Sequence, residues 1–180
     1  SRIADVFAAS NAKSVSSLDK ISASLKYTAG LWASQGWEVE NLVGVLGVLY
    51  DTGVRGEKAG RMLASAIRSL IKPTASATDE IVKLFGKVDA LSPAFNTIEE
   101  IVYKLKKVGA SQAEITKIFG KESSEIMTRL VTNSEAIQSS IEGVTNQLGE
   151  ATRQAAMQNT SLKAQAQILG NTFQKVGLNI

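Results

Sequence analysis

The residues that come nearest to a known chemical motif are the glycines of the stretch Gly53–Gly60. A phosphate-binding loop has the pattern G-x-x-x-x-G-K-[ST] after a strand, so that backbone amides and one lysine surround the phosphates. Here Gly60 is followed by Arg61 and Met62, and the residues before Gly53 have helical spacing. The stretch therefore does not predict a nucleotide site.

Acidic side chains are not spaced for catalysis or for metal binding. Glu99 and Glu100 are neighbours on a predicted helix, so they point to different sides and cannot work as an acid and base pair. Asp79 and Glu80 are expected to begin a helix after Thr78, where negative charge stabilises the N-terminus. The sequence contains no spaced cluster of carboxylates of the kind that binds a metal ion.

The composition excludes several further kinds of chemistry. The 180 residues include no histidine and no cysteine, which excludes catalysis by either residue, thiolate metal sites and disulfides. The net charge of +3 is too small to indicate nucleic-acid binding. Lys104, Lys106 and Lys107 lack interleaved aromatic residues and are better explained as a solvated helix end. We expect no enzymatic activity, no cofactor and no specific nucleic-acid partner.

The spacing of apolar residues predicts an all-α chain. We expect a short helix near Ile3–Asn11, a second helix from Ser16 or Ser17 to Gly36, and a third helix after Trp37. Trp37 is expected to pack on Leu42 across the start of that third helix. The core face of the helix that follows is expected to contain Met62, Leu63, Ala66, Ile67 and Leu70.

Small residues mark the junction between the third and fourth helices. Gly53 can take the left-handed conformation that ends a helix, and Gly56 opens the next one. Ala59 and Gly60 lie in the first turn of that helix, where small side chains let two backbones come close. Pro73 ends the fourth helix at or near the residue two positions before it. We expect these residues to serve turns and close packing only.

Two eight-residue segments nearly repeat each other. Residues 80–87 and 114–121 match at six of eight positions, 34 residues apart, and the second contains Phe119 and Gly120. This is the period of tetratricopeptide repeats, but no third copy is present and the tryptophan and tyrosine positions of that repeat are missing. Two amphipathic helices that end in Phe-Gly explain the pattern without a repeat fold.

The stretch from Ser134 to about Val176 contains no proline, and its apolar residues recur at alternating spacings of four and three. This spacing is typical of the seam between paired helices, and its register changes near residues 158–161. A helix of this length would be about 65 Å long and needs a partner, most simply copies of itself. The residues of this predicted oligomer seam are Ile137, Ile141, Val144, Leu148, Ala151, Ala155, Leu162, Ala166, Leu169, Phe173 and Val176.

The surface of the same stretch is rich in amides and poor in charge. Ser134–Ile180 contains eleven Asn or Gln residues and only six charged residues. Such a surface suits a rod that slides inside another protein, because it avoids strong ionic attachment to the wall. A surface helix of biased composition is the alternative explanation.

Several of these segments resemble the core region of phage tail tape measure proteins. The motif Asp-Thr-Gly-Val-Arg-Gly-Glu-Lys-Ala-Gly, at residues 51–60, lies between two helices as it does in that family. Similar residues lie upstream at 5–12 and 25–27, and downstream at 118–122, where Phe-Gly-Lys-Glu matches a family turn. The resemblance covers nearly the whole chain. It departs from the family pattern at residues 89–96, where Pro93 occupies a shorter link.

The resemblance implies a structural protein of a phage or prophage tail. A tape measure protein sets tail length, scaffolds the assembly of the tail tube and leaves the tube ahead of the DNA. Helix length is proportional to residue count, so a helical chain can act as a ruler. The partners implied are copies of the chain itself, tail tube and tail-tip proteins and a tail assembly chaperone. The implied location is the tail lumen of the virion, and the host cytoplasm during assembly.

Two other functions stay open at this point. An oligomerising helical adaptor or scaffold would use the same seam, but a ruler requires many hundreds of residues of helix. Membrane insertion through Leu42–Tyr50 is a weaker alternative, since nine residues fall short of the roughly 20 that cross a bilayer; any membrane contact is expected outside this chain. We expect a helical bundle over residues 1–133, a long coiled-coil-like helix over residues 134–180, and a fragment of a longer chain, because the sequence begins at Ser1.

Overall fold

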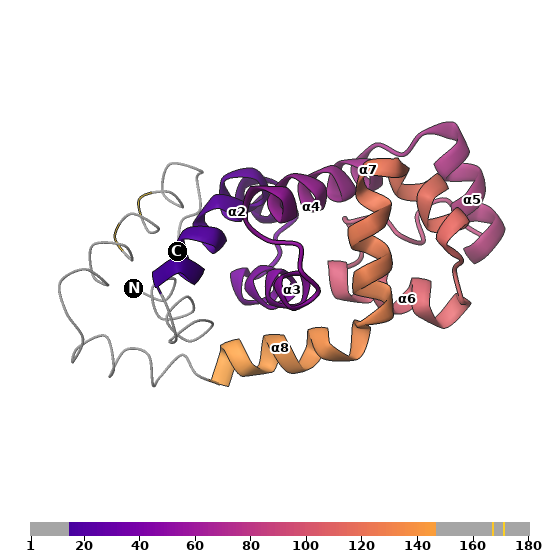
Figure 1. Cartoon of the computed structure of the whole chain (residues 1–180). Helices are drawn as coiled ribbons and strands as arrows, with labels where there is room; N and C mark the ends of the chain where they lie inside the picture. Colours follow the sequence, from indigo (N-terminus) through magenta and orange to yellow (C-terminus); the bar gives the residue numbers. More distant parts are fainter. Residues whose placement is uncertain (1–14, 147–166, 168–170, 172–180) are drawn as a thin grey trace.

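The computed structural model describes residues 15–146, 167 and 171 (Figure 1), and every element in residues 15–146 is an α-helix. The predicted all-α class is confirmed. The helix expected near Ile3–Asn11 lies outside the described residues. The same holds for the seam positions after α8: Leu148, Ala151, Ala155, Leu162, Ala166, Leu169, Phe173 and Val176. The helices are α2 (Val15–Ser34), α3 (Val39–Asp51), α4 (Gly56–Ile71), α5 (Ala75–Phe85), α6 (Ile98–Val108), α7 (Gln112–Thr132) and α8 (Ser134–Asn146).

One end of the molecule is built from α2, α3 and α4. Helices α2 and α4 pack along each other, and α3 crosses beneath them in the view of Figure 1. The indole N–H of Trp32 donates to the Glu38 carbonyl (2.8 Å), and its ring meets Trp37 edge to face with the ring centroids 4.7 Å apart. This geometry is favourable for aromatic pairs and fixes the α2–α3 link on the core. The expected contact of Trp37 with Leu42 stays a prediction.

The junction between α3 and α4 has the predicted limits. Helix α3 ends at Asp51, and Gly53 follows in the left-handed region at φ +91°. Helix α4 begins at Gly56 and ends at Ile71, two residues before Pro73, because a proline restricts the residue before it to extended conformations. Its core face is the predicted one: Met62, Leu63, Ala66, Ile67 and Leu70 are all buried.

The other end of the molecule contains α5, α6 and the first half of α7, each with an N-cap that the sequence supplies. Thr74 caps α5, and Thr97 and Ser111 form capping boxes at the starts of α6 and α7. A capping box satisfies two backbone donors that have no partner inside the helix. The expectation that α5 begins after Thr78 is wrong, because Thr74 caps the helix one turn earlier, directly after Pro73.

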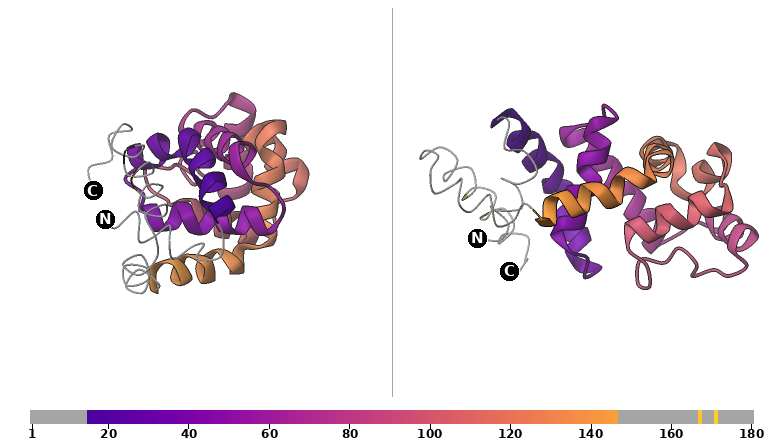
Figure 2. Two further views of the ribbon diagram at one scale, coloured as in Figure 1. Left: turned by 60° about the vertical axis from the view of Figure 1, so that its left-hand side comes forward. Right: turned by 90° about the horizontal axis from the view of Figure 1, so that it is seen from below.

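Helix α7 changes direction at Gly120, whose φ of +77° and ψ of 164° lie outside the helical region. A side chain is disfavoured at such a backbone conformation, so glycine is required here. The second half of α7 then runs back across the molecule and joins α8 (Figure 2). A helical segment therefore ends at the Phe-Gly pair of the second near-repeat and another begins in a new direction, just as the first copy ends α5 at Gly86 (φ +77°).

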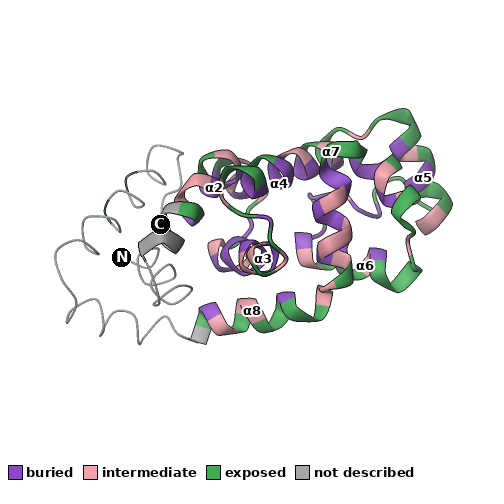
Figure 3. Cartoon of the chain, viewed as in Figure 1, coloured by how far each residue is buried: buried purple, intermediate pink, exposed green. Residues whose placement is uncertain are grey.

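Helix α8 covers α3 and also touches α6. Its inward side is buried and its outward side is exposed (Figure 3). The sequence predicted a bundle that ends at residue 133, but Ile137 and Val144 of α8 are part of the core. Over Ser134–Asn146 the predicted seam is thus already covered by the same chain.

Candidate functional site: helix junctions and assembly surfaces

Two helices come close together at Gly60 of α4 and Ser24 of α2. A Cβ atom placed on Gly60 would lie 2.3 Å from the Ser24 carbonyl oxygen and 2.7 Å from its Cα atom. Both atoms belong to the backbone and cannot move aside as a side-chain end can. Ala59, one residue earlier, is fully buried. At Gly60 two backbones pack closely, which is the role expected of a small residue there, and the role of Ala59 stays a prediction.

Ser24 also ties the α3–α4 junction to α2. Its hydroxyl donates to the Gly56 carbonyl, and the same oxygen lies 2.6 Å from the Tyr50 hydroxyl, near the end of α3. Burial raises the pKa of Tyr50 above its usual value, and its hydrogen bond with Ser24 opposes that rise. The predicted junction residue Gly56 is therefore held by Ser24, which in turn contacts Tyr50, and the sequence analysis singled out neither of these two side chains.

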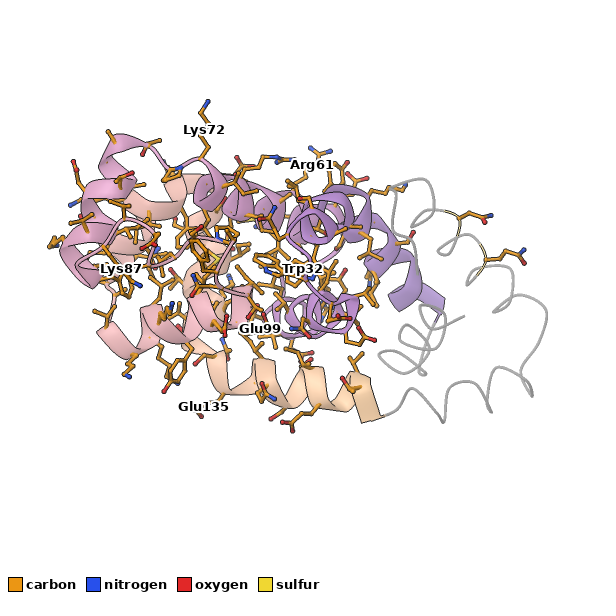
Figure 4. The ribbon with its side chains drawn as sticks, turned by 180° about the vertical axis from the view of Figure 1, so that it is seen from behind. Trp32, Arg61, Lys72, Lys87, Glu99 and Glu135 are labelled. Carbon is orange, nitrogen blue, oxygen red and sulfur yellow. The ribbon has the colours of Figure 1, made fainter. Side chains whose placement is uncertain are left out.

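The outer face of this contact carries a small polar cluster. Arg61 of α4 lies over the Tyr27 ring, 4.9 Å from its centroid, and pairs with Glu57 at 3.2 Å. Figure 4 shows Arg61 at the edge of the molecule and Trp32 inside it. An ion pair this exposed contributes little to stability. The cluster covers the helix contact and forms no recognisable chemical site.

Helices α5 and α7 are joined by two ion pairs that mirror each other. Glu80 of α5 pairs with Lys117 of α7 (2.9 Å), and Glu114 of α7 pairs with Lys83 of α5 (3.0 Å). The near-repeat aligns Glu80 with Glu114 and Lys83 with Lys117, so each copy binds the other through equivalent residues. Reciprocal contacts of this kind are characteristic of a two-fold interface. The two copies form a pair, and the 34-residue spacing arises without a repeat fold.

Both carboxylates in these pairs, those of Glu114 and Glu80, have a lowered pKa. The Ser111 backbone N–H at the start of α7, with Lys83 and the Ser111 hydroxyl, lowers the pKa of Glu114 to about 2. Lys83 and Lys117 lower the pKa of Glu80, whose side chain is only 5% exposed. The α5–α7 contact is thus stabilised by ionised carboxylates.

Phe119 and Gly120 lie where α7 meets α4. Phe119 is buried, and its carbonyl accepts a hydrogen bond from the Ser69 hydroxyl of α4 (3.3 Å). Beyond the bend, Arg129 donates to the Thr52 carbonyl at the end of α3 (2.7 Å). The second half of α7 therefore links the two ends of the bundle.

Helix α8 sits on two glycines of α3. A Cβ atom on Gly44 would lie 2.5 Å from the Cγ1 atom of Ile141 and 3.0 Å from its backbone nitrogen. The Ser140 hydroxyl donates to the Gly44 carbonyl (3.0 Å), and Gly47 lies beside the same serine. The apolar, glycine-containing stretch that could have entered a membrane is instead covered by α8.

A groove of about 880 Å³ runs between α6 and the first turn of α8. Phe95 and Tyr103, which are 74% and 62% exposed, line it together with Ile137. Glu99 also borders the groove, accepts a hydrogen bond from Asn41 of α3, and has a pKa raised by burial. Figure 4 shows Glu99 facing α3 and Glu135 at the outer side of α8.

The described residues hold no arrangement typical of a metal centre. No three acidic residues among them converge on one point, and the chain has no histidine or cysteine. No described helix is both long enough and apolar enough to span a bilayer. The candidate sites among the described residues are therefore the contacts between helices and the groove between α6 and α8.

Comparisons with known proteins identify the family. Residues 1–120 match the family described as phage-related minor tail protein. The tape measure protein of Pneumococcus phage Dp-1 is 24% identical over 183 residues, which cover 98% of this chain and 16% of that protein. The probable tape measure protein of Escherichia phage P2 is 30% identical over 138 residues, which cover 72% of this chain and 17% of that protein.

The chain spans about a sixth of the length of these curated relatives. No solved structure matches it with statistical significance. The family match covers two thirds of the chain and includes the α3–α4 junction, α5 and the first half of α7. The chain therefore belongs to the phage-related minor tail protein family, together with the tape measure proteins of these phages.

Proposed function

We propose that this chain is a segment of a tape measure protein that sets tail length, scaffolds the tail tube and leaves the tube during genome ejection. The observation that carries the proposal is its similarity, over 98% of its residues, to the tape measure protein of phage Dp-1. The apolar spacing of residues 134–176 also supports it, because that spacing predicts a continuous helix, which has a fixed length per residue.

The role is structural. Its partners would be the tail tube and tail-tip proteins, a tail assembly chaperone and copies of the chain itself. The protein would lie in the lumen of the tail in the virion, and in the host cytoplasm during assembly. The amide-rich, nearly neutral composition of residues 134–180 suits a chain that passes through the tube without ionic attachment to its wall.

The ejection role can be tested with purified phage particles that carry this chain. Quantitative mass spectrometry should find its peptides in intact virions and in isolated tails. After receptor-triggered DNA release, the same peptides should be depleted from the empty particles, while tube peptides stay constant. If the amount of these peptides were equal before and after release, the proposal would be contradicted. Their absence from intact tails would contradict it too, because a host adaptor or a scaffold that never enters the virion would give that result.

A further inference from the structure

A single residue, Asn133, separates α7 from α8. Its φ of −106° and ψ of 26° differ from helical values by roughly 40° and 70°. Its backbone N–H already donates to the Arg129 carbonyl (3.0 Å), which is the spacing of a helical hydrogen bond. The Asn133 side chain donates to the same carbonyl (2.8 Å) and caps α7. Rotation of φ by about 40° and of ψ by about 70° at this one residue would thus join α7 and α8 into one continuous helix.

The core contacts of α8 lie on one of its sides, against helices that precede the hinge. Ile137 and Val144 are buried, and Ser140 and Ile141 meet the glycines of α3. Near the hinge, Glu135 pairs with Lys106 of α6 (2.9 Å). The residues on the opposite side are polar or small and exposed: Ala136, Gln138, Ser139, Glu142 and Thr145.

The surface of α3 fits α8 closely, because two glycines of α3 lie under it. A side chain at Gly44 would displace Ile141, and the hydroxyl of Ser140 needs the Gly44 carbonyl within reach. In Figure 1, α7 approaches the corner steeply and α8 turns away from it to lie under α3. A helix that continued the axis of α7 would leave α3 uncovered. It would also carry the apolar side of α8 into solvent, where the α3 surface of another copy could cover it in the same way.

We propose that α8 is an exchangeable arm: Asn133 becomes helical, and α8 of one copy packs on Gly44 and Gly47 of a second copy, which returns its own α8. Each of the two copies gives its α8 to the other, so the dimer has two-fold symmetry and offers no further binding site. Each α8 makes the same contacts on the second copy as it makes within its own chain. A one-residue connection between two helices favours such exchange, since it has little freedom to relax. This dimer concerns the chain itself and stands apart from any role in tail length.

The absence of cysteine allows a direct test by engineered disulfide. A Cβ atom at Gly47 lies 3.0 Å from the Ser140 Oγ atom, and a disulfide holds the Cβ atom of one cysteine at roughly this distance from the sulfur of the other. In the variant Gly47→Cys/Ser140→Cys, the disulfide should therefore form within one chain in the monomer and between two chains in the exchanged dimer. Gly47→Cys/Ser139→Cys is the matched control, because Ser139 lies on the outward side of α8.

The full 180-residue chain would be separated into monomer and dimer by size exclusion, oxidised, and run on a denaturing gel without reductant. We expect the dimer fraction to give a covalent dimer and the monomer fraction to give a covalent monomer. Asn133→Ala removes the side-chain cap and favours helix, so it should raise the dimer fraction several-fold. Insertion of three glycines after Asn133 should lower it, since the arm can then fold back freely.

A mixture of two single variants supplies a second readout. Gly47→Cys on a tagged chain and Ser140→Cys on an untagged chain, unfolded and refolded together, can form the mixed disulfide only if α8 is exchanged. Two results would overturn the proposal. One is a dimer fraction whose disulfides all close within single chains. The other is the absence of any dimer at high concentration in both the parent chain and Asn133→Ala.

Discussion

At Gly60 the missing side chain sets the distance between two helices. The nearest atoms of α2 are backbone atoms of Ser24, so neither helix can accommodate even a methyl group without moving. Because the two helices are this close, the Ser24 hydroxyl can donate a hydrogen bond to the Gly56 carbonyl (2.6 Å). One glycine and one serine thereby position the motif that resembles the tape measure family.

Substitution of Gly60 should destabilise the chain without affecting any chemistry. We expect Gly60→Ala to lower the free energy of unfolding by roughly 1–3 kcal/mol, the usual cost of overpacking, and Gly60→Leu to lower it further. Gly143→Ala is the control, because no atom lies within 4 Å of a Cβ atom there. Alanine favours helix, so this control should be neutral or stabilising by up to about 1 kcal/mol. Urea unfolding measures both, and full stability of Gly60→Leu would refute the close-packing role.

At the scale of helices, the caps and the mirrored ion pairs decide which segments meet. Ser111 caps α7 and places Glu114 within reach of Lys83, which ties the start of α7 to α5. The near-repeat supplies the residues for these pairs, because both copies have glutamate and lysine three residues apart. The repeat is visible in the sequence but the pairing is not, since nothing in a single sequence shows that two helices face each other.

Removal of the Ser111 cap should weaken α7 in a defined way. Ser111→Ala should cost about 1 kcal/mol of stability, the typical value for a lost N-cap. It should also raise the pKa of Glu114, because the Ser111 hydroxyl and the N–H that it positions both stabilise the carboxylate. Ser111→Asp keeps the cap and should restore stability. A pKa of Glu114 that is unchanged in the alanine variant, measured by NMR titration, would contradict this coupling.

The α5–α7 contact should weaken in acid. The ordinary pKa of a glutamate is 4.5, and that of Glu114 in the folded chain is about 2. A lowered folded-state pKa means that the stabilisation is complete above pH 4.5 and is lost as the pH falls toward 2. The difference in unfolding free energy between the parent chain and Glu114→Gln should therefore be largest at pH 7 and shrink below pH 4.5. Glu122→Gln is the control, since Glu122 is exposed and has no ion pair among the described residues. If the difference in unfolding free energy between the parent chain and Glu114→Gln did not change with pH, the result would count against this mechanism.

Much of the fold could be predicted from the sequence, because helix spacing, glycines and prolines act locally. The limits of α4 and its core face follow from Gly56, Pro73 and the apolar pattern. The start of α5 was misplaced because Thr74 and Thr78 are both possible caps and only packing selects between them. The partner of α8 could not be foreseen, since the same apolar spacing fits another copy or the glycines of α3.

At the scale of the whole molecule, the proposed function requires the bundle and any continuous helix to contribute differently to tail length. Residues 15–146 fold back on themselves, so they would add the width of the bundle and not the summed length of its helices (Figure 2). Only a continuous helix adds about 1.5 Å per residue. The proposed ruler would therefore lie in helical stretches outside the bundle, beginning with the predicted seam after α8.

Tail length tests this account most directly. In phage that carry this chain, deletions of 14 and 28 residues within 148–176 leave α8 intact, and electron microscopy of many tails would measure the effect. The account predicts tails shorter by about 21 and 42 Å, in proportion to the residues removed. The bundle variant Gly60→Leu should leave the length of any assembled tails unchanged. Tails of normal length in both deletion mutants would contradict the account.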